Sequence, residues 1–431
     1  MRSSIILTFS FLSVLFAQTQ LGNDIDGEAA GDQSGHSISI DSDGDRVAIG
    51  AYYNDGTGTN AGHVRVYEYS SSSWSQLGSD IDGEAANDRS GNAVSLDSDG
   101  DRVAIGGYFN DGTGAEAGHV RVYAYSSGSW TQLGSDINGE AAGDQFGRSV
   151  SLNSDGTIVA IGAHYNDGTA SNAGHVRVYE YSSGSWSQLG SDIDGEAADD
   201  QSGNSEDGSA VSLNSDGDRV AIGANLNDGT GTSAGHVRVY EYSSGSWSKL
   251  GSDIDGEAAG DNSGISVSLD SDGDRVAIGG YYNNGTGTQA GHVRVYEYSS
   301  GSWSQLGSDI DGEAAGDLFG ISVSLDSDGD RVVIGAQSNA GTALAAGHAR
   351  VYAYSSGSWS QLGSDIDGEA AGDSFGHSVS MDSDGDRVAV AAFRNDGTAS
   401  NAGHVRIYAY DTTAPTVTSV TSTTANGSYN A

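Results

Sequence analysis

A phrase of twelve residues returns seven times along this chain, and this repetition limits the possible folds more than any other feature. LGSDIDGEAAGD, or a close copy of it, begins each repeat. The repeats start at Leu21, Leu77, Leu133, Leu189, Leu250, Leu306 and Leu362. Successive starts are 56 residues apart, except for one interval of 61. A regular period of this kind is typical of solenoids, propellers and domain arrays.

Each repeat contains four short runs in which polar and apolar residues alternate. In the second repeat these runs are NAVSL (92–96), RVAIG (102–106), HVRVYAY (119–125) and WTQLGSDI (130–137). Such runs, rich in Val, Ile, Tyr and Trp, predict β-strands. Four antiparallel strands per repeat is the pattern of a propeller blade. The sequence therefore predicts an all-β fold: a seven-bladed β-propeller of four-stranded antiparallel blades.

The two ends of the repeat region complement each other. Six repeats open their fourth strand with a tryptophan, whereas the seventh stops at HVRIYAYD (404–411) and has no fourth strand. The segment QTQLGNDI (18–25) aligns with WSQLGSDI of the other repeats. We therefore expect the N-terminal strand to complete blade seven, so that the ring closes without an open strand edge.

Composition changes sharply at both ends of the propeller region, 18–410. Residues 1–17 place Arg2 before an apolar run that ends at Ala17, the pattern of a cleaved signal peptide. Residues 411–431 are rich in Thr and Ser, and we expect a linker and the start of a truncated Ig-like domain. These features predict a secreted or cell-surface protein, a monomer within a larger modular chain.

The chain is strongly acidic, with 59 Asp and Glu against 18 Lys and Arg and a net charge of −41. This charge argues against nucleic acid and anionic membranes as partners, and no apolar stretch predicts membrane insertion. There is no cysteine, which excludes disulfides. Cations are the natural counterpart of such a surface.

Three repeats carry a motif that resembles a known family. FGRSVSLNSDGTIVAIGA (146–163), FGISVSLDSDGDRVVIGA (319–336) and FGHSVSMDSDGDRVAVAA (375–392) resemble the FG-GAP repeat of integrin alpha-subunit propellers and of bacterial exported proteins. Serine replaces the phenylalanine in the other four repeats. The resemblance implies an extracellular recognition or adhesion propeller that often carries calcium in the turn after the FG strand.

The DSDGD segment of each repeat is either a calcium loop or a tight turn. Acids at alternating positions suit calcium, but no later acid follows to complete the ligand set. Asp-Gly at the centre is retained in every repeat, as a tight hairpin requires. We favour the turn and leave calcium as the one cofactor to test. Its candidate ligands are Asp41, Asp43, Asp45, Asp97, Asp99, Asp101, Asp270, Asp272, Asp274, Asp326, Asp328, Asp330, Asp382, Asp384 and Asp386.

Strand direction places the long connections of every blade on one rim and the short turns on the other. A ligand is therefore expected at the long-loop rim. The first repeat would contribute Asp26, Glu28, Asp32, Asn54 and Asp55 there, with solvation as the simpler role for these side chains. Two breaks in the repetition, NSEDG (204–208) and SNAGT (338–342), fall in the same connections.

Seven histidines occupy one repeated position in GHVRVY, two residues before a repeated arginine. We interpret this pair, and likewise the tryptophans, as structural. An enzyme needs one asymmetric constellation, and a residue copied seven times does not provide it, so we expect no enzyme. The sequence predicts an adhesion or recognition module for an extracellular protein or glycan. The alternatives are a propeller enzyme of the polysaccharide lyase or glycosidase type, or a passive surface spacer.

Overall fold

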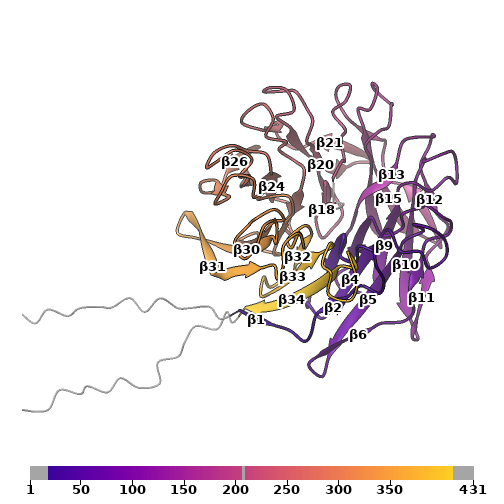
Figure 1. The fold of residues 1–431 in the computed structure, drawn as a ribbon. Helices are drawn as coiled ribbons and strands as arrows, with labels where there is room; N and C mark the ends of the chain where they lie inside the picture. The colour runs from indigo at the N-terminus through magenta and orange to yellow at the C-terminus, as the bar shows by residue number, and fades with distance from the viewer. Residues whose placement is uncertain (1–17, 206–208, 411–431) are drawn as a thin grey trace, which may run out of the picture.

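Seven small β-sheets stand around a common axis in the computed structural model, which describes residues 18–205 and 209–410 (Figure 1). Strands, turns and loops make up all the described residues, and none of these residues forms a helix that could cross a membrane. The prediction of a seven-bladed, all-β propeller is confirmed. The expected signal peptide and the expected linker lie outside the described residues, as does part of the NSEDG insertion.

Each blade has four antiparallel strands, which follow chain order from the axis outward except in blade seven, where the N-terminal segment supplies the outer strand. The innermost strands are β3 (Ser37–Ile40), β8 (Ala93–Leu96), β13 (Phe146–Leu152), β18 (Val211–Leu213), β23 (Val267–Leu269), β28 (Val323–Leu325) and β32 (Val379–Met381). The second strands are β4 (Arg46–Ala51), β9 (Arg102–Gly107), β14 (Ile158–Ala163), β19 (Arg219–Ala224), β24 (Arg275–Gly280), β29 (Arg331–Ala336) and β33 (Arg387–Ala392). The third strands are β5 (His63–Ser70), β10 (His119–Ser126), β15 (His175–Ser182), β20 (His236–Ser243), β25 (His292–Ser299), β30 (His348–Ser355) and β34 (His404–Tyr410).

The outer strand of most blades is broken into two pieces that pair with the same third strand. The first pieces are β6 (Ser73–Gln76), β11 (Ser129–Gln132), β16 (Ser185–Gln188), β21 (Ser246–Lys249), β26 (Ser302–Gln305) and, for blade seven, β1 (Gln18–Gln20). The second pieces are β7 (Ile81–Asp82), β12 (Ile137–Asn138), β17 (Ile193–Asp194), β22 (Ile254–Asp255), β27 (Ile310–Asp311) and β2 (Ile25–Asp26). In blade six both pieces merge into β31 (Ser358–Asp367).

The core lies between neighbouring blades. Side chains alternate across a strand, so Val64 and Val66 of β5 point to one face of blade one. Both valines are fully buried, and they pack with Val94 and Ile105 of blade two. Equivalent clusters fill the other interfaces around the ring. Each blade is therefore stabilised on both faces by its neighbours.

The N-terminal segment closes the ring, as predicted. β1 pairs antiparallel with the last strand, β34, in the register Gln18 to Tyr410. β2 continues the pairing, with Ile25 opposite Val405. Figure 1 shows this start of the chain beside the final strand. The outer edge of blade seven thereby has the same form as that of the other blades.

The tryptophans connect the outer strands of successive blades. The Trp74 Nε1 atom donates a hydrogen bond to the carbonyl oxygen of Leu21, at 2.8 Å, and so ties blade one to the N-terminal segment. The other five tryptophans make the same bond to the preceding blade. Each ring also packs against a tyrosine of its own blade. These contacts support the structural interpretation of the tryptophans.

The DSDGD segments form the hairpin turns between the first and second strands. Gly44 has a φ of 65°, a left-handed conformation that favours glycine. The Asp41 carboxylate accepts hydrogen bonds from the backbone N–H groups of Asp45 and Arg46, at 2.9 and 3.0 Å. Asn153 accepts both equivalent bonds in blade three, and Asn214 accepts the one from the Arg219 N–H in blade four. The first residue of the segment therefore caps the turn, and an amide can do so as well as a carboxylate can.

The turns also bond to one another around the axis. The backbone N–H of Ser42 donates to the carbonyl of Ser98 in the next blade, at 3.1 Å. The same bond links every adjacent pair of turns until Ser383 N–H donates to Ser42, at 3.2 Å. Seven hydrogen bonds thus form a closed ring at this end of the propeller. Backbone hydrogen bonds between the turns therefore fix the positions of the turns at this rim.

Closure by the N-terminal segment predicts the cost of removing an isoleucine from it. Ile25 is 5% exposed and has the same place in blade seven as Ile81, 4% exposed, in blade one. Ile25→Ala and Ile81→Ala should each lower the free energy of unfolding by about 2 to 5 kcal/mol, as measured by chemical denaturation. If Ile25→Ala left the free energy of unfolding nearly unchanged while Ile81→Ala lowered it, the N-terminal segment would not be part of the core.

A buried carboxylate at the turn predicts a gain in stability from Asp41→Asn. Burial and the nearby Asp45 carboxylate raise the pKa of Asp41 to about 6. Because the folded state holds the proton more tightly, this acid opposes folding increasingly as pH rises from about 4 to 6. In blade four, by contrast, the Asn214 amide donates to Asp218 at 2.9 Å.

Asp41→Asn should therefore add about 1 to 2 kcal/mol at pH 7, less than the ~3 kcal/mol that the full pKa shift represents, and nothing at pH 4. The comparison is between variant and wild type at each pH, since the buried histidines contribute a pH dependence of opposite sign to both. Asn214→Asp is the reciprocal variant and should lose stability at pH 7. Equal melting temperatures at pH 7 would contradict the assignment.

Candidate functional site

The acids proposed as calcium ligands have unequal surroundings. Asp41 is 4% exposed, and its Oδ1 atom is already bonded to the turn. Asp43 is exposed, and Asp45 is half-buried. The Arg46 guanidinium lies across the neighbouring turn, where it donates to the Asp99 carbonyl at 3.0 Å and pairs with Glu68. One of the candidate calcium ligands, Asp41, therefore already stabilises the turn, and the cationic side chain of Arg46 lies beside the candidate ligands.

The expected long-loop residues do come together on one rim, where most of them shape the loops. Asp32 is buried and accepts hydrogen bonds from Asn54 and from the backbone of Ala29. Asn54 and Asp55 accept backbone hydrogen bonds within their own loop. Glu28 forms an ion pair. Among the five residues predicted in this repeat, only Asp26 is exposed and makes no hydrogen bond or ion pair through its side chain with the described residues.

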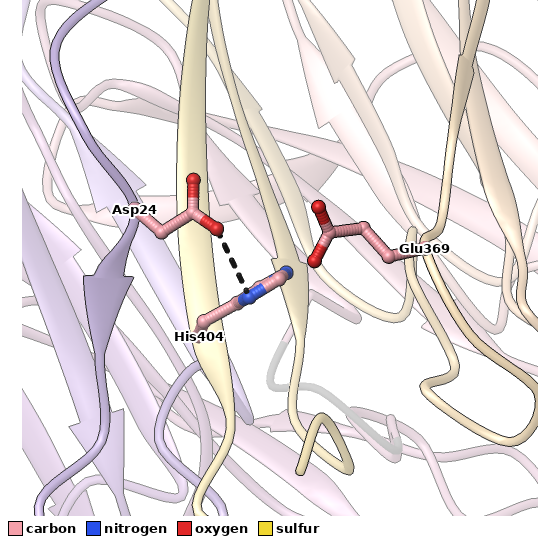
Figure 2. Close-up of side chains that lie close together, drawn as sticks. All are labelled: Asp24, Glu369 and His404. Atoms are coloured by element: carbon pink, nitrogen blue, oxygen red, sulfur yellow. Dashed lines mark ion pairs between the residues drawn. The ribbon is translucent and has the colours of Figure 1, made fainter. Parts of the chain in front are cut away.

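The repeated histidines lie in clusters with two carboxylates, as Figure 2 shows for Asp24, Glu369 and His404. The His404 Nδ1 atom lies 3.6 Å from Asp24. Burial and the Arg406 guanidinium lower the pKa of His404, so the imidazole is neutral near pH 7. Arg406 itself pairs with both carboxylates and so supplies the positive charge of the cluster. The interpretation of His-x-Arg as a structural pair fits this arrangement.

A second set of residues, at the long-loop end of the axis, differs from blade to blade. In every blade except blade four, it occupies positions just before the innermost strand or early in it, and just after the second strand. We call this set the axial mouth. It comprises His36, Tyr52, Tyr53, Arg89, Asn92, Tyr108, Phe109, Arg148, His164, Tyr165, Ile265, Tyr281, Tyr282, Leu318, Ile321, Gln337, His377, Phe393 and Arg394.

Contacts across blade boundaries join the axial mouth into one surface. The His36 ring of blade one lies 5.0 Å from the His377 ring of blade seven. Arg89 of blade two stacks on Tyr53 of blade one, with its Cζ atom 5.1 Å from the ring centroid. His377 Nδ1 lies 2.8 Å from Gln337 Oε1 of blade six. Apolar side chains of blades five and six continue the arc.

Two arginines flank one tyrosine in this surface. The Cζ atoms of Arg89 and Arg148 lie 5.7 and 5.0 Å from the centroid of the Tyr108 ring. Arg89 also donates to the Tyr108 hydroxyl, at 2.6 Å, and Arg148 donates to Asn92, at 3.2 Å. Their positions are therefore fixed by neutral partners.

Two histidines of the mouth, His164 and His377, are neutral at physiological pH. Burial, with Arg394 and Arg148, lowers the pKa of His377 to about 3. Arg148 belongs to blade three and His377 to blade seven, so this effect acts across the axis. Burial, with Arg148, also holds the pKa of His164 well below its usual value. A neutral imidazole can accept a proton or a hydrogen bond from a ligand.

The axial mouth was not predicted, although the sequence holds a signal for it. Seven of the ten histidines and thirteen of the seventeen arginines recur in the HVR and GDR segments. Among the described residues, the non-recurring ones are His36, His164, His377, Arg89, Arg148 and Arg394, and all six lie in the mouth. The predicted site residues all belong to repeated motifs, whereas the asymmetry of the chain lies in the residues that do not recur.

Comparison with known proteins supports the fold. The FG-GAP repeat model matches residues 138–179. No curated protein sequence matches this chain. The chain is similar to a protein assigned as a 6-phosphogluconolactonase from Bacteroides uniformis, with 11% identity and a TM-score of 0.53, over 78% of this chain and 86% of that one.

Two further solved structures are similar to it. The periplasmic gluconolactonase of Pseudomonas aeruginosa has 15% identity and a TM-score of 0.52, over 77% of this chain and 86% of that one. The β-propeller domain of Swd1 from Myceliophteria thermophila has 9% identity and a TM-score of 0.53, over 91% and 99%. At these identities the likeness concerns the fold.

The prediction that this chain is not an enzyme is wrong, because two of these neighbours are lactonase propellers of comparable extent. Its premise also fails. The repeats were expected to offer only sevenfold copied chemistry, yet the axial mouth brings together single-copy His, Arg and Tyr side chains. With the FG-GAP match at 138–179 and seven four-stranded blades, the chain is an FG-GAP-like β-propeller.

Proposed function

We propose that the axial mouth is the active site of an enzyme that hydrolyses a sugar lactone. The single observation that carries this proposal is the Gln337–His377 pair beside the mouth arginines. The lactonase neighbours supply the reaction class, and the mouth supplies an oriented imidazole, cationic side chains and aromatic rings on which a sugar can stack.

His377 has the features of a proton acceptor. Its Nδ1 atom faces the Gln337 side-chain oxygen at 2.8 Å, an arrangement that places the imidazole proton on Nδ1. The Nε2 lone pair is then left for a ligand, and no described residue bonds to this atom. A base held in one tautomer by a third group is the logic of general-base catalysis.

In the proposed reaction, water attacks the lactone carbonyl and gives its proton to His377 Nε2. The arginines stabilise the negative charge that develops on the carbonyl oxygen. The ring C–O bond then breaks, and the ring oxygen takes a proton from the imidazolium to leave a hydroxy acid. Phe393 and His36 lie 4.3 and 5.0 Å from the His377 ring, centroid to centroid, so entry of the substrate requires these rings to move.

A polysaccharide lyase is the second candidate. Proton abstraction from a uronate needs a base and a cation for the carboxylate, and the mouth offers both. A glycosidase fits less well, since it needs paired carboxylates and the mouth set contains no Asp or Glu. A passive spacer has no need of single-copy arginines and histidines. Recognition of a protein or glycan, export and attachment in a larger chain stay predictions from the sequence.

His377→Asn tests the proposed function directly. Because it removes the proton acceptor, we expect kcat for D-glucono-1,5-lactone to fall at least 100-fold, measured by pH-stat above the spontaneous rate. The matched control is His119→Asn, a repeated histidine that is equally buried but lies outside the mouth, which should lower the melting temperature and leave kcat unchanged. No activity of the wild type on lactones or uronate polymers would sink the proposal.

Calcium at the DSDGD turns can be tested separately. A cavity of about 410 Å³ between blades one and seven is lined by Asp43, Asp45, Asp382, Asp384 and Asp386, with Arg387 beside them. Because Arg387 supplies a positive charge there, we expect calcium to raise the melting temperature no more than magnesium does. A saturable rise with calcium alone would show that the turns bind this ion.

A further inference from the structure

Among the described residues, the three arginines of the axial mouth have no acidic partner, a property shared by only three of the thirteen repeated arginines, Arg102, Arg331 and Arg387. The described chain carries a large excess of carboxylates, and most of its repeated arginines lie within 4.0 Å of one. No carboxylate of the described residues forms an ion pair with Arg89, Arg148 or Arg394. In so acidic a protein, unpaired guanidinium groups gathered at one place need an explanation.

The fold holds two of these arginines in place without neutralising them. Arg89 stacks on Tyr53 and Phe109, with Cζ to centroid distances of 5.1 and 4.3 Å, and donates to the Tyr108 hydroxyl. Arg148 donates to Asn92, whose own amide donates back to the Arg148 carbonyl at 3.3 Å. Aromatic faces and neutral acceptors orient a guanidinium and leave its full charge for a ligand.

Buried N–H donors of these arginines also indicate an anionic ligand. The Nε atoms of Arg89 and Arg148 are buried and have no hydrogen-bond partner among the described residues. The Nε atoms of Arg121, Arg294 and Arg406 share this feature, but each of those guanidinium groups also has a carboxylate within 4.0 Å. An unmet donor on a charged group is costly, and an oxyanion is the partner that satisfies it best. Carboxylates and phosphates match the planar fork of arginine.

From this arrangement we infer that the axial mouth binds an acidic sugar, whose carboxylate or phosphate is bound by Arg89 and Arg148. The aromatic side chains Tyr53, Phe109 and Tyr165, of which Tyr165 is 37% exposed, are placed to contact the sugar ring. This inference rests on the proposed function, because it names the substrate class of the same site.

Binding of an anion also affects the proposed proton acceptor. Arg148 and Arg394 contribute to the low pKa of His377. An oxyanion beside these arginines offsets their charge and so makes the imidazole a stronger base. An acidic substrate would thus activate the group that acts on it, whereas a neutral sugar would not.

The test measures binding separately from turnover. Isothermal titration with D-glucuronate and with D-glucose 6-phosphate distinguishes carboxylate from phosphate, and D-glucose is the uncharged comparison. We expect at least one of the two acidic sugars to bind, with at least tenfold higher affinity than glucose. Arg89→Gln and Arg148→Gln should each weaken that binding about tenfold or more, and Arg148→Lys should restore part of it.

Arg102→Gln is the matched control. It removes the same charge at the opposite end of the axis, where Arg102 donates to the Gly156 carbonyl, and should leave the affinity unchanged. An equal loss in Arg102→Gln, or no loss in the Arg89 and Arg148 variants that retain the wild-type melting temperature, would overturn the inference. So would failure of both acidic sugars to bind.

The outcomes for substrate class and for catalysis are distinguishable. Arginine-dependent binding of an acidic sugar without turnover of any lactone or uronate would support the inference and count against the enzyme. Turnover of a neutral lactone with the same kcat/KM in the arginine variants would support the enzyme and overturn the inference.

Discussion

Pairing between the first and the last strands of the propeller is the interaction on which the rest of the structure depends. β1 and β2 complete blade seven by bonding to β34, and Trp74 of blade one then binds the carbonyl of Leu21. Without this closure, blades one and seven would each expose an apolar face and a strand edge. Ring closure places all seven blades around one central axis. The ring of serine backbone hydrogen bonds and the axial mouth both depend on this arrangement.

Repetition and asymmetry have separate places in this molecule. The repeated residues lie where every blade has the same surroundings. Valines pack between sheets, tryptophans bond to the outer strand of the preceding blade, and an aspartate or asparagine caps each turn. At the long-loop end of the axis, side chains of six blades, all except blade four, come together instead. A ligand bound there would contact several blades at once, so each blade could contribute a different group, as His377, Gln337 and Arg148 would.

The distribution of charge follows the same division. Carboxylates cap turns and loops, and the repeated arginines pair with them at blade boundaries. A carboxylate that caps a turn lowers stability at neutral pH when it is buried, as Asp41 illustrates, since burial beside Asp45 raises its pKa. In the mouth, Arg89 and Arg148 are held by a tyrosine and an asparagine, which leave the guanidinium charge uncompensated. A small cationic surface therefore lies within a strongly acidic protein, and only the folded ring creates it.

The amino-acid sequence by itself determined the blade. A period of 56 residues, alternating runs such as HVRVYAY and the Asp-Gly pair predict four strands and a tight turn, because these are local properties of the chain. Even ring closure could be read from the missing seventh tryptophan and the spare QTQLGNDI segment. The site could not, because His377, Gln337, Arg89 and Arg148 come from four different blades, and nothing in their spacing relates them. Only the tertiary structure brings them to one end of the axis. The same packing decided which acids form hydrogen bonds within the loops and which arginines have no acidic partner.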